Sequence, residues 1–306
     1  MLSMRTTVRV RVPGSTSNLG AGFDCVGVAV DRWLHVTARI EGAGAPTVER
    51  GGTLRGLNVP PEHDLLYRGF AAACRRAERD VPSGVVFTAD SNVPVARGLG
   101  SSAAAAVAGA VAASALLDLG LDRATLTALC TDLEGHADNV APAVYGGAIL
   151  VLVATGGLIV TPLVVHPTLG FVFAVPEFTV ETKRARAVLP ATLQHADAVQ
   201  AAAKSAALVH GLAHADPRLL AAAFDDVLHV PYRRSLVPGY DAVTAAAVAA
   251  GAFGATLSGS GPTVVAVAPL ARLVAVGDAM VRAWRGCDIS AEAFHVAHPA
   301  GGYETE

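Results

Sequence analysis

The chain has 306 residues and 52% of them are hydrophobic, which is enough for a large core in one large domain or two smaller ones. The net charge is −3 with basic and acidic residues spread along the sequence, so neither a nucleic-acid partner nor an anionic membrane surface is indicated. The four cysteines are far apart, which excludes a zinc-ligand pattern and a disulfide framework and indicates reduced thiols in a cytoplasmic protein.

Two stretches without Asp, Glu, Lys or Arg, 99–117 and 139–176, require a test for membrane spans. The first is mostly alanine, glycine and serine, which partition poorly into lipid and pack closely inside globular proteins. The second is divided by prolines and glycine pairs into apolar runs much shorter than the ~20 residues of a spanning helix. We therefore expect a buried helix and core strands, and no membrane partner.

The N-terminal part of the chain predicts a strand followed by a loop with binding character. Charge and valine alternate at period two over residues 5–13, which predicts the strand and lacks the apolar core of an export signal. The loop over 14–27 holds four glycines, three hydroxyl side chains, Asn18 and the single acid Asp24. Such a loop is costly to order, so we interpret it as a site, with a long connection built on Asx turns as the alternative.

The most distinctive loop of the chain is Pro94–Ser102, which has two glycines and paired serines and runs into an alanine-rich helix to about residue 119. The first amides of a helix have no internal partner and carry the positive dipole end, so this pattern is typical of an anion site. No lysine lies near it, so the ordinary P-loop interpretation fails, and a capped turn before a core helix is an equal alternative on this loop alone. The elements expected before it are a strand over 28–40, a hairpin and loop over 39–58, a helix over 64–80 and a strand over 84–89.

Polar side chains gather at the junction after a predicted helix over 122–133. Glu134, His136, Asp138 and Asn139 follow one another within six residues. Taken singly, Asp138 or Asn139 is read as a helix N-cap and His136 as a satisfied junction residue. Glu134 is a lone carboxylate in a weakly charged region near a candidate phosphate loop, which is what Mg²⁺ requires beside phosphate oxygens and a hydroxyl.

The second half predicts a small α+β domain. A hairpin of strands over 148–153 and 158–163 precedes a boundary near residue 166, so we expect domains over 1–166 and 167–306. The order strand, helices, strand, helix, strand then suggests helices on one face of a small sheet. The strands are expected over 171–176, 264–268 and 289–298, and the helices over 193–214, 219–226, 241–250 and 271–285.

Three further segments of this half carry polar groups. A helix that begins within 179–190 holds three cations including Arg186, for which a solvated face is the default interpretation. The two-proline loop over 230–240 includes Arg233 and suits a guanidinium that forks onto a carboxylate. A second glycine and hydroxyl loop extends over 254–263.

The loops over 13–27, 94–102 and 258–263 together resemble the three motifs of the GHMP kinases, named after galactokinase, homoserine kinase, mevalonate kinase and phosphomevalonate kinase. The match covers the chain from end to end, and its Pro-x-x-x-Gly-Leu-Gly-Ser-Ser is similar to that superfamily's ATP loop. The resemblance implies the α+β GHMP kinase fold, with an N-terminal ribosomal-S5-like domain that contains a left-handed β-α-β unit and a ferredoxin-like C-terminal domain. It implies ATP contacts from Pro94, Arg97, Gly98, Leu99, Gly100, Ser101 and Ser102.

Within this superfamily, residues 13–24, 136–142 and 231–233 most resemble the homoserine kinases. That resemblance implies L-homoserine as the acceptor, with ATP and Mg²⁺. It implies that Asn18 and Asp24 bind the ammonium and that Arg186 and Arg233 bind the carboxylate. It implies that Ser102 and Glu134 bind the magnesium. The other residues that it places in the same pocket are His136, Asn139, Ser258 and Gly259. The physical chemistry agrees, because a zwitterion needs an acid and a cation at opposite ends, whereas mevalonate or a sugar has no ammonium.

The implied reaction is phosphoryl transfer without an evident general base. Some kinases of the superfamily have an aspartate where this chain has Asn139. Phosphoryl transfer depends mainly on alignment and on neutralising charge. We therefore expect direct in-line attack of the substrate hydroxyl on the γ-phosphorus, oriented by Asn139, Arg186 and Thr182, on the route to threonine.

Two departures from the family pattern leave the nucleotide-base contacts open. The family often has a lysine before the ATP loop and an asparagine before the Leu-x-Tyr-Arg helix, where this chain has Ser91 and Asp64. Arg97 is a candidate replacement for the missing cation. The alternative functions are a kinase for another small hydroxyl substrate such as mevalonate and a non-catalytic ATP-binding regulator on the same fold. The oligomeric state is open, with a homodimer among the options.

Overall fold

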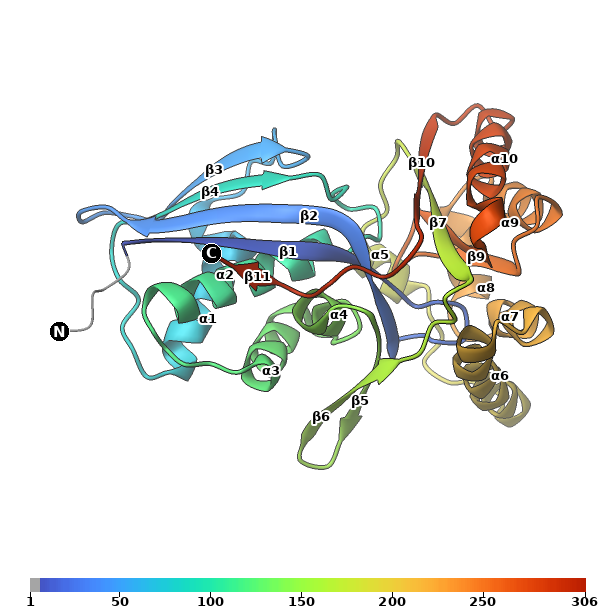
Figure 1. The fold of residues 1–306 in the computed structure, drawn as a ribbon, viewed down its shortest axis with the longest axis horizontal. Coiled ribbons are helices and arrows are strands. Elements are labelled where there is room, and N and C mark those ends of the chain that lie inside the picture. Colours follow the sequence, from blue (N-terminus) through green and yellow to red (C-terminus); the bar gives the residue numbers. More distant parts are fainter. Residues whose placement is uncertain (1–5) are drawn as a thin grey trace.

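The computed structural model describes residues 6–306, and its strands form two β-sheets (Figure 1). The larger sheet contains β1 Thr7–Ser17, β2 Val26–Ile40, β3 Thr47–Gly52, β4 Val85–Ser91, β5 Ala148–Ala154, β6 Gly157–Leu163 and β11 Glu304–Thr305. The smaller sheet contains β7 Leu169–Pro176, β8 Gly254–Leu257, β9 Val264–Pro269 and β10 Ala291–Val296. The helices are α1 Leu65–Arg76, α2 Ser101–Leu116, α3 Arg123–Glu134, α4 Val140–Tyr145, α5 Thr182–Ala187, α6 His195–His214, α7 Pro217–Phe224, α8 Val230–Arg233, α9 Tyr240–Ala249 and α10 Leu273–Arg285. Short 3₁₀ turns lie at Pro61–His63, Arg234–Leu236 and Leu270–Arg272.

The strand order in the larger sheet brings the first loop of the chain to the site. The order is β11-β1-β2-β4-β3, and the hairpin of β5 and β6 continues from β2. β1 shifts its register against β2 between Pro13 and Gly14 and then runs on to Ser17. The predicted loop therefore begins as strand, and the buried residues Ser15, Thr16 and Ser17 are held by ladder hydrogen bonds.

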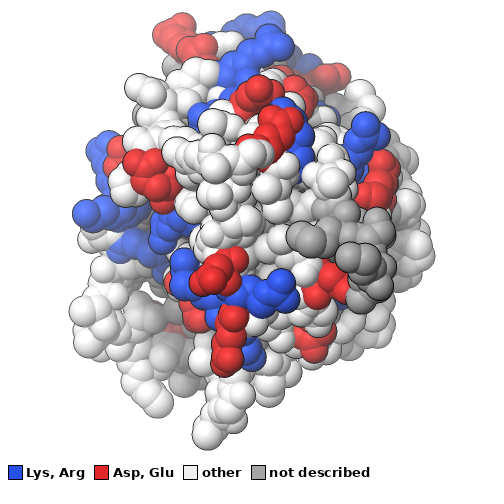
Figure 2. All heavy atoms as spheres, turned by 90° about the vertical axis from the view of Figure 1, so that its left-hand side faces the viewer, with Lys and Arg blue, Asp and Glu red and all other residues white. Residues whose placement is uncertain are grey.

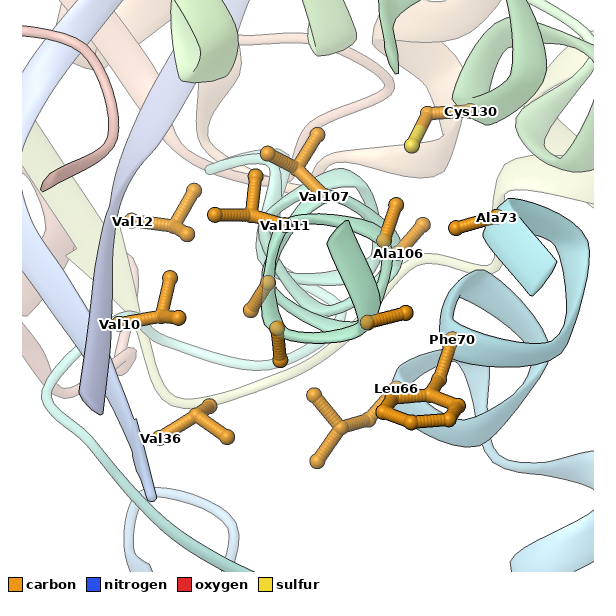
Figure 3. Close-up of a cluster of buried hydrophobic side chains, with 14 of the residues drawn as sticks. Val10, Val12, Val36, Leu66, Phe70, Ala73, Ala106, Val107, Val111 and Cys130 are labelled. Carbon is orange, nitrogen blue, oxygen red and sulfur yellow. The ribbon is translucent and has the colours of Figure 1, made fainter. Parts of the chain in front are cut away.

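Helix α2 lies at the centre of the core beneath the larger sheet. Helices α1 to α4 cover one face of that sheet (Figure 1). Figure 3 shows Val107 and Val111 of α2 between the valines of β1 and β2 on one side and α1 on the other. A helix of mostly alanine fits here because it is buried nearly all round and its neighbours approach closely. A Cβ at Gly109 would collide with the carbonyl of Leu66, so glycine is required where α1 crosses α2.

The central strand β7 of the smaller sheet is buried on both faces. In β7, Phe171 and Phe173 point into a cluster with α6 and α7, whereas Val172 and Ala174 point into a second cluster with α9 and α10. Alternate residues of a strand point to opposite faces, which explains why all of β7 is apolar. The expectation of helices on one face only was wrong, because α6 and α7 cover part of the second face.

The predicted helices and most predicted strands are confirmed, with shifted ends, and the hairpin is confirmed as β5 and β6. Other predictions were wrong, among them the loop over 230–240, in which residues 230–233 form helix α8. Residues 39–58 form no hairpin, because β3 pairs parallel with β4. Residues 14–17 and 254–257 are strand and not loop. Strand β11, which pairs with β1, was not predicted.

The predicted strand over 5–13 begins at a residue outside the described part of the chain. The first residues of the segment that was compared with an export signal also lie outside it. Within residues 6–306, none of the helices is both long enough and apolar enough to cross a membrane. On the face shown in Figure 2, basic and acidic side chains are interspersed.

Candidate active site

The three glycine and hydroxyl loops recognised in the sequence meet at one place. Ser258 Oγ donates to the carbonyl of Gly98 at 2.6 Å and shares a hydrogen bond with Thr16 Oγ1 at 2.8 Å. The backbone N–H of Gly259 donates to the carbonyl of Ser17 at 2.8 Å. These bonds join β1, the loop before α2 and the loop after β8, so residues far apart in sequence form one site.

A cavity of about 410 Å³ lies where these loops meet. Three predicted site residues, Asp24, Glu134 and Ser258, are not part of its lining, but each is hydrogen-bonded to a residue that is. The predicted residues that line the cavity are Asn18, Pro94, Arg97, Gly98, Leu99, Gly100, Ser101, Ser102, His136, Asn139, Thr182, Arg186, Arg233 and Gly259.

Helix α2 begins directly after the second loop, and its first amides are open. Gly98 and Gly100 have φ angles of 73° and 68°, in the left-handed region that favours glycine. No side chain caps the helix, so its first three N–H groups have no intrahelical partner. These donors and the positive end of the helix dipole adjoin the cavity, which is the arrangement of an anion site. The alternative of a serine-capped turn has no cap hydrogen bond to support it.

Arg97 in the same loop is bonded to the second half of the chain. Its guanidinium donates to the carbonyl oxygens of Pro176 at 2.9 Å, Glu177 at 2.5 Å and Val95 at 3.1 Å. Three of its five donors are thereby used by backbone carbonyls. Two donors of Arg97 remain, and the residue lines the cavity. Arg97 also links the loop to the segment before α5.

Ser102 and Glu134 supply two oxygen atoms beside the open helix end. Ser102 Oγ donates to Glu134 Oε2 at 2.7 Å. In residues 6–306, no cluster of three or more His, Cys, Asp and Glu side chains could hold a metal by protein ligands alone. Mg²⁺ commonly takes one or two protein oxygens together with phosphate oxygens and waters, so a hydroxyl and a carboxylate beside a phosphate site fit this ion.

Asp24 and Arg186, expected at opposite ends of a zwitterion, are bonded to each other. Two guanidinium nitrogens of Arg186 donate to the two oxygens of Asp24, at 2.9 and 3.2 Å, and each side chain is 38% exposed. Asn18 holds the acid in place, because its Oδ1 accepts from the backbone N–H of Asp24 at 2.8 Å and its Nδ2 donates to Gly259 O at 3.1 Å. The structure therefore brings both charges into the site in a mutually neutralised form.

Arg233 is a buried cation without an acidic partner. Arg233 is 1% exposed, and its guanidinium forms no ion pair with a carboxylate of residues 6–306. Its guanidinium donates to the carbonyls of Ala185 at 3.0 Å and Gly259 at 3.3 Å. Burial, followed by the nearby charge of Arg186, lowers the pKa of Arg233 to about 10. A guanidinium that lines a cavity under these conditions is suited to bind an anionic group of a ligand.

Asn139 is fixed by two hydroxyl groups of β1. Ser15 Oγ donates to Asn139 Oδ1 at 2.9 Å, and Asn139 Nδ2 donates to Ser17 Oγ at 2.8 Å. Both serines are fully buried. This network orients the amide and leaves one of its two N–H donors without a bond to a residue of the described chain.

His136 and Asp138 form a second buried pair in the cavity wall. His136 Nδ1 lies 2.8 Å from Asp138 Oδ1. Burial opposes the charge on Asp138, but the hydrogen bond and charge of His136 keep the pKa of Asp138 below its ordinary value. Burial likewise opposes the charge on His136, and the bond to Asp138 nevertheless raises the pKa of His136. A carboxylate with a lowered pKa is a weak proton acceptor, so this cavity residue is a poor general base.

The two departures from the family pattern have structural partners in this chain. Asp64 caps α1 through the N–H of Leu66 at 2.8 Å and accepts from Arg50 at 2.6 Å. The hydroxyl of Ser91 accepts from the N–H of Val93 at 3.0 Å. Asp64, Arg50 and His63 line the cavity together with the apolar residues Leu34, Val48, Leu54, Leu57 and Val59.

Sequence reasoning gave no role to four residues that shape the site. Ser15 and Ser17 were counted only as loop hydroxyls, and Asp138 was interpreted as an N-cap. Arg50 lies in a segment expected to be surface loop, so no local signal pointed to it. The spacing of the two serines on an alternating strand was the one signal available for the Asn139 network.

Models of two families match the two halves of the chain: the GHMP kinases N-terminal domain over residues 64–147 and the GHMP kinases C-terminal domain over residues 208–286. The chain is 41% identical to the homoserine kinase of a Synechococcus strain over 304 residues, which is 98% of each chain. It is 40% identical to that of a Picosynechococcus strain over 292 residues, which is 94% of this chain and 95% of the relative.

Solved structures give the same result. The crystal structure of homoserine kinase from Cytophaga hutchinsonii has a TM-score of 0.89 and 29% identity, and covers 100% of this chain and 99% of its own. The crystal structure of L. major mevalonate kinase in complex with R-mevalonate has a TM-score of 0.68 at 16% identity, over 97% of this chain and 96% of its own, which shows the shared fold alone.

Both matched domains make this protein an ATP-dependent phosphotransferase of the GHMP kinase superfamily. Identity of about 40% along nearly the whole length is decisive within that superfamily. The chain belongs to the homoserine kinase family.

Proposed function

We propose that this kinase transfers the γ-phosphoryl group of ATP to the side-chain hydroxyl of L-homoserine, giving O-phospho-L-homoserine on the route to threonine. The observation that carries the proposal is Arg233, a buried guanidinium at the cavity with no carboxylate partner in residues 6–306. A buried charge is costly unless it is compensated, and a carboxylate delivered by the acceptor matches its forked geometry. Relatives at about 40% identity are named homoserine kinases.

The acceptor's ammonium group is assigned to Asp24. The Asp24 and Arg186 side chains are each 38% exposed, and an ion pair of that kind contributes only about 1 kcal/mol or less. Replacing Arg186 by the substrate ammonium as the partner of Asp24 therefore costs little free energy. Arg186 then turns to the substrate carboxylate beside Arg233, so a zwitterion is held by one acid and two cations.

The phosphate groups are assigned to the open amides at the start of α2. Ser102 and Glu134 are the residues that would hold Mg²⁺. When bound there with ATP, the ion supplies neutralisation of the charge on the phosphate oxygens. Glycine is required at 98 and 100, because a Cβ there would collide with the carbonyl of Ser258 and with Ser15 Oγ, and the positive φ angles also favour glycine.

The chemical step we propose is direct in-line attack of the homoserine hydroxyl on the γ-phosphorus. The new O–P bond forms as the bond to ADP breaks, and the hydroxyl proton passes to an oxygen of the transferred phosphoryl group. The free N–H of Asn139 orients the hydroxyl, together with Arg186 and Thr182, which also line the cavity. Asn139 cannot accept the proton, and Asp138 is a weak base because His136 lowers its pKa. Alignment and charge neutralisation thus carry the reaction, as the loose transition state of phosphoryl transfer permits.

The release of ADP with different acceptors tests the proposed function. We expect release with L-homoserine and none above background with mevalonate or shikimate, because neither has an ammonium for Asp24. Phosphorus NMR of the product is expected to place the phosphate on the side-chain oxygen. Faster release with mevalonate would contradict the assigned substrate, and no release with any of the three would favour a non-catalytic regulator.

Asp24→Asn separates the amino-acid substrate from other acceptors. Loss of the carboxylate is expected to lower kcat/KM for L-homoserine by about 30-fold or more while the KM for ATP changes little, because one partner of a charge pair is removed. The matched control is Asp278→Asn at an exposed position of α10. A wild-type kcat/KM in the Asp24→Asn enzyme would show that Asp24 does not bind the substrate ammonium.

Asn139→Ala tests the orienting role of the amide. We expect kcat to fall by about 100-fold with a small change in KM, as for loss of one donor that acts on the reacting groups. Unchanged turnover would show that Asn139 has no such role. Asn139→Asp provides the second arm, since a variant faster than the wild-type enzyme would contradict a step without a general base.

A further inference from the structure

His229 precedes the short helix α8 and is fully buried, yet it does not line the cavity. Its backbone is fixed by Asp226, whose Oδ2 accepts from the N–H groups of His229 at 2.7 Å and Val230 at 2.8 Å. A buried imidazole on so rigid a backbone has few orientations available. The neighbours of its two ring nitrogens therefore indicate what it does.

The two ring nitrogens contact two different parts of the proposed acceptor site. His229 Nε2 lies 3.2 Å from the carbonyl oxygen of Gly20, in the loop between Asn18 and Asp24. His229 Nδ1 lies 3.4 Å from Nη1 of Arg233. A carbonyl can only accept and a guanidinium can only donate, so Nε2 carries the hydrogen and Nδ1 is the acceptor. Only this one neutral tautomer satisfies both neighbours.

The surroundings of the ring favour that neutral form. Burial lowers the pKa of His229 to about 4, with Arg233 acting in the same direction and Asp226 opposing it. Asp226 and Arg233 are the charged groups nearest the imidazole, and Nε2 lies 3.7 Å from Asp226 Oδ2. The ring therefore keeps Nδ1 free to accept from Arg233 over the ordinary working range of an enzyme.

Phe23 joins the same cluster. Its ring stacks on the imidazole of His229 with centroids 5.0 Å apart and an angle of 20°. The guanidinium carbon of Arg233 lies 5.1 Å from the centroid of Phe23. Phe23 adjoins Asp24, so movement of the imidazole is transmitted both to the acidic end of the site and to its buried cation.

We propose that His229 is a positioning residue that fixes the distance between the two charged ends of the acceptor site, the Asn18–Asp24 loop through Gly20 and the carboxylate-binding Arg233. This inference rests on the proposed function, since it assigns those ends to the ammonium and carboxylate of an amino acid. It implies that specificity for an α-amino acid depends on a residue outside the cavity. None of the three contacts involves the phosphate loop, so the nucleotide side is not expected to depend on His229.

Three substitutions separate the contributions of the ring. His229→Phe keeps volume and stacking but removes both hydrogen bonds. His229→Asn keeps an acceptor near the position of Nδ1, toward Arg233, and His229→Gln keeps a donor near the position of Nε2, toward Gly20. The matched control is His210→Phe at an exposed position of α6. Melting curves of all variants verify that each one is folded.

Steady-state kinetics with L-homoserine and ATP give the decisive readout. We expect His229→Phe to raise the KM for L-homoserine by about tenfold or more, because a bond to a charged group is lost, and to leave the KM for ATP within about twofold. His229→Asn is expected to recover part of that loss. With 3-amino-1-propanol, which lacks the carboxylate, His229→Phe and His229→Asn are expected to be equal.

Several results would overturn the inference. A wild-type KM for L-homoserine in folded His229→Phe would do so, and so would a parallel rise of both KM values, which indicates general loosening. Equal KM values for His229→Asn and His229→Phe with L-homoserine would show that the hydrogen bond between His229 Nδ1 and Arg233 does not contribute to acceptor binding. Failure of the wild-type protein to phosphorylate L-homoserine would instead contradict the proposed function, so the two failures are distinguishable.

Discussion

A guanidinium buried without an acidic partner is the constraint on which the acceptor side of this protein depends. Moving such a cation out of water costs several kcal/mol even after relaxation. Within residues 6–306, the groups in direct contact with the Arg233 guanidinium are neutral: the carbonyls of Ala185 and Gly259, the imidazole of His229 and the face of Phe23. The charges of Asp24, Asp138 and Asp226 act on it only from beyond ion-pair distance. Neutral dipoles stabilise the charge only in part, and the lowered pKa of Arg233 reflects the hydration that the guanidinium loses on burial. The remaining free energy is available to a ligand carboxylate.

The two sides of the site rest on different physical principles but share their supports. In the proposed function, the phosphate side relies on backbone amides and the dipole of α2, whose alanines are explained by its burial in the core. The acceptor side uses side-chain charges, most of them from the second half of the chain. Arg97 joins the two, because it binds the carbonyls that precede α5, and Ser258 joins them through the carbonyl of Gly98. Changes at Arg97 or Ser258 themselves are therefore expected to reach both substrates.

Local patterns in the sequence predicted much of the fold and the membership of the site. Glycine, hydroxyl and helix signals are local, so the three loops and most elements were recognisable. Strand β3 and strand β11 were not, because their pairing is non-local and their sequences are short and polar. The partners of each charge were equally hidden. Nothing in the sequence shows that Asp24 is bonded to Arg186, or that His229 shares a hydrogen bond with Arg233.

The central claim is that Arg233 is a buried charge kept for the acceptor carboxylate, and thermal unfolding of Arg233→Met tests it most directly. Removing the buried cation relieves its desolvation cost but also removes the donor to the carbonyls of Ala185 and Gly259, so the test is the shift of the melting temperature that the ligand causes. Added L-homoserine is expected to raise the melting temperature of the wild-type protein through ligand linkage and to leave that of the variant unchanged. A variant that keeps the wild-type increase with L-homoserine would contradict this account.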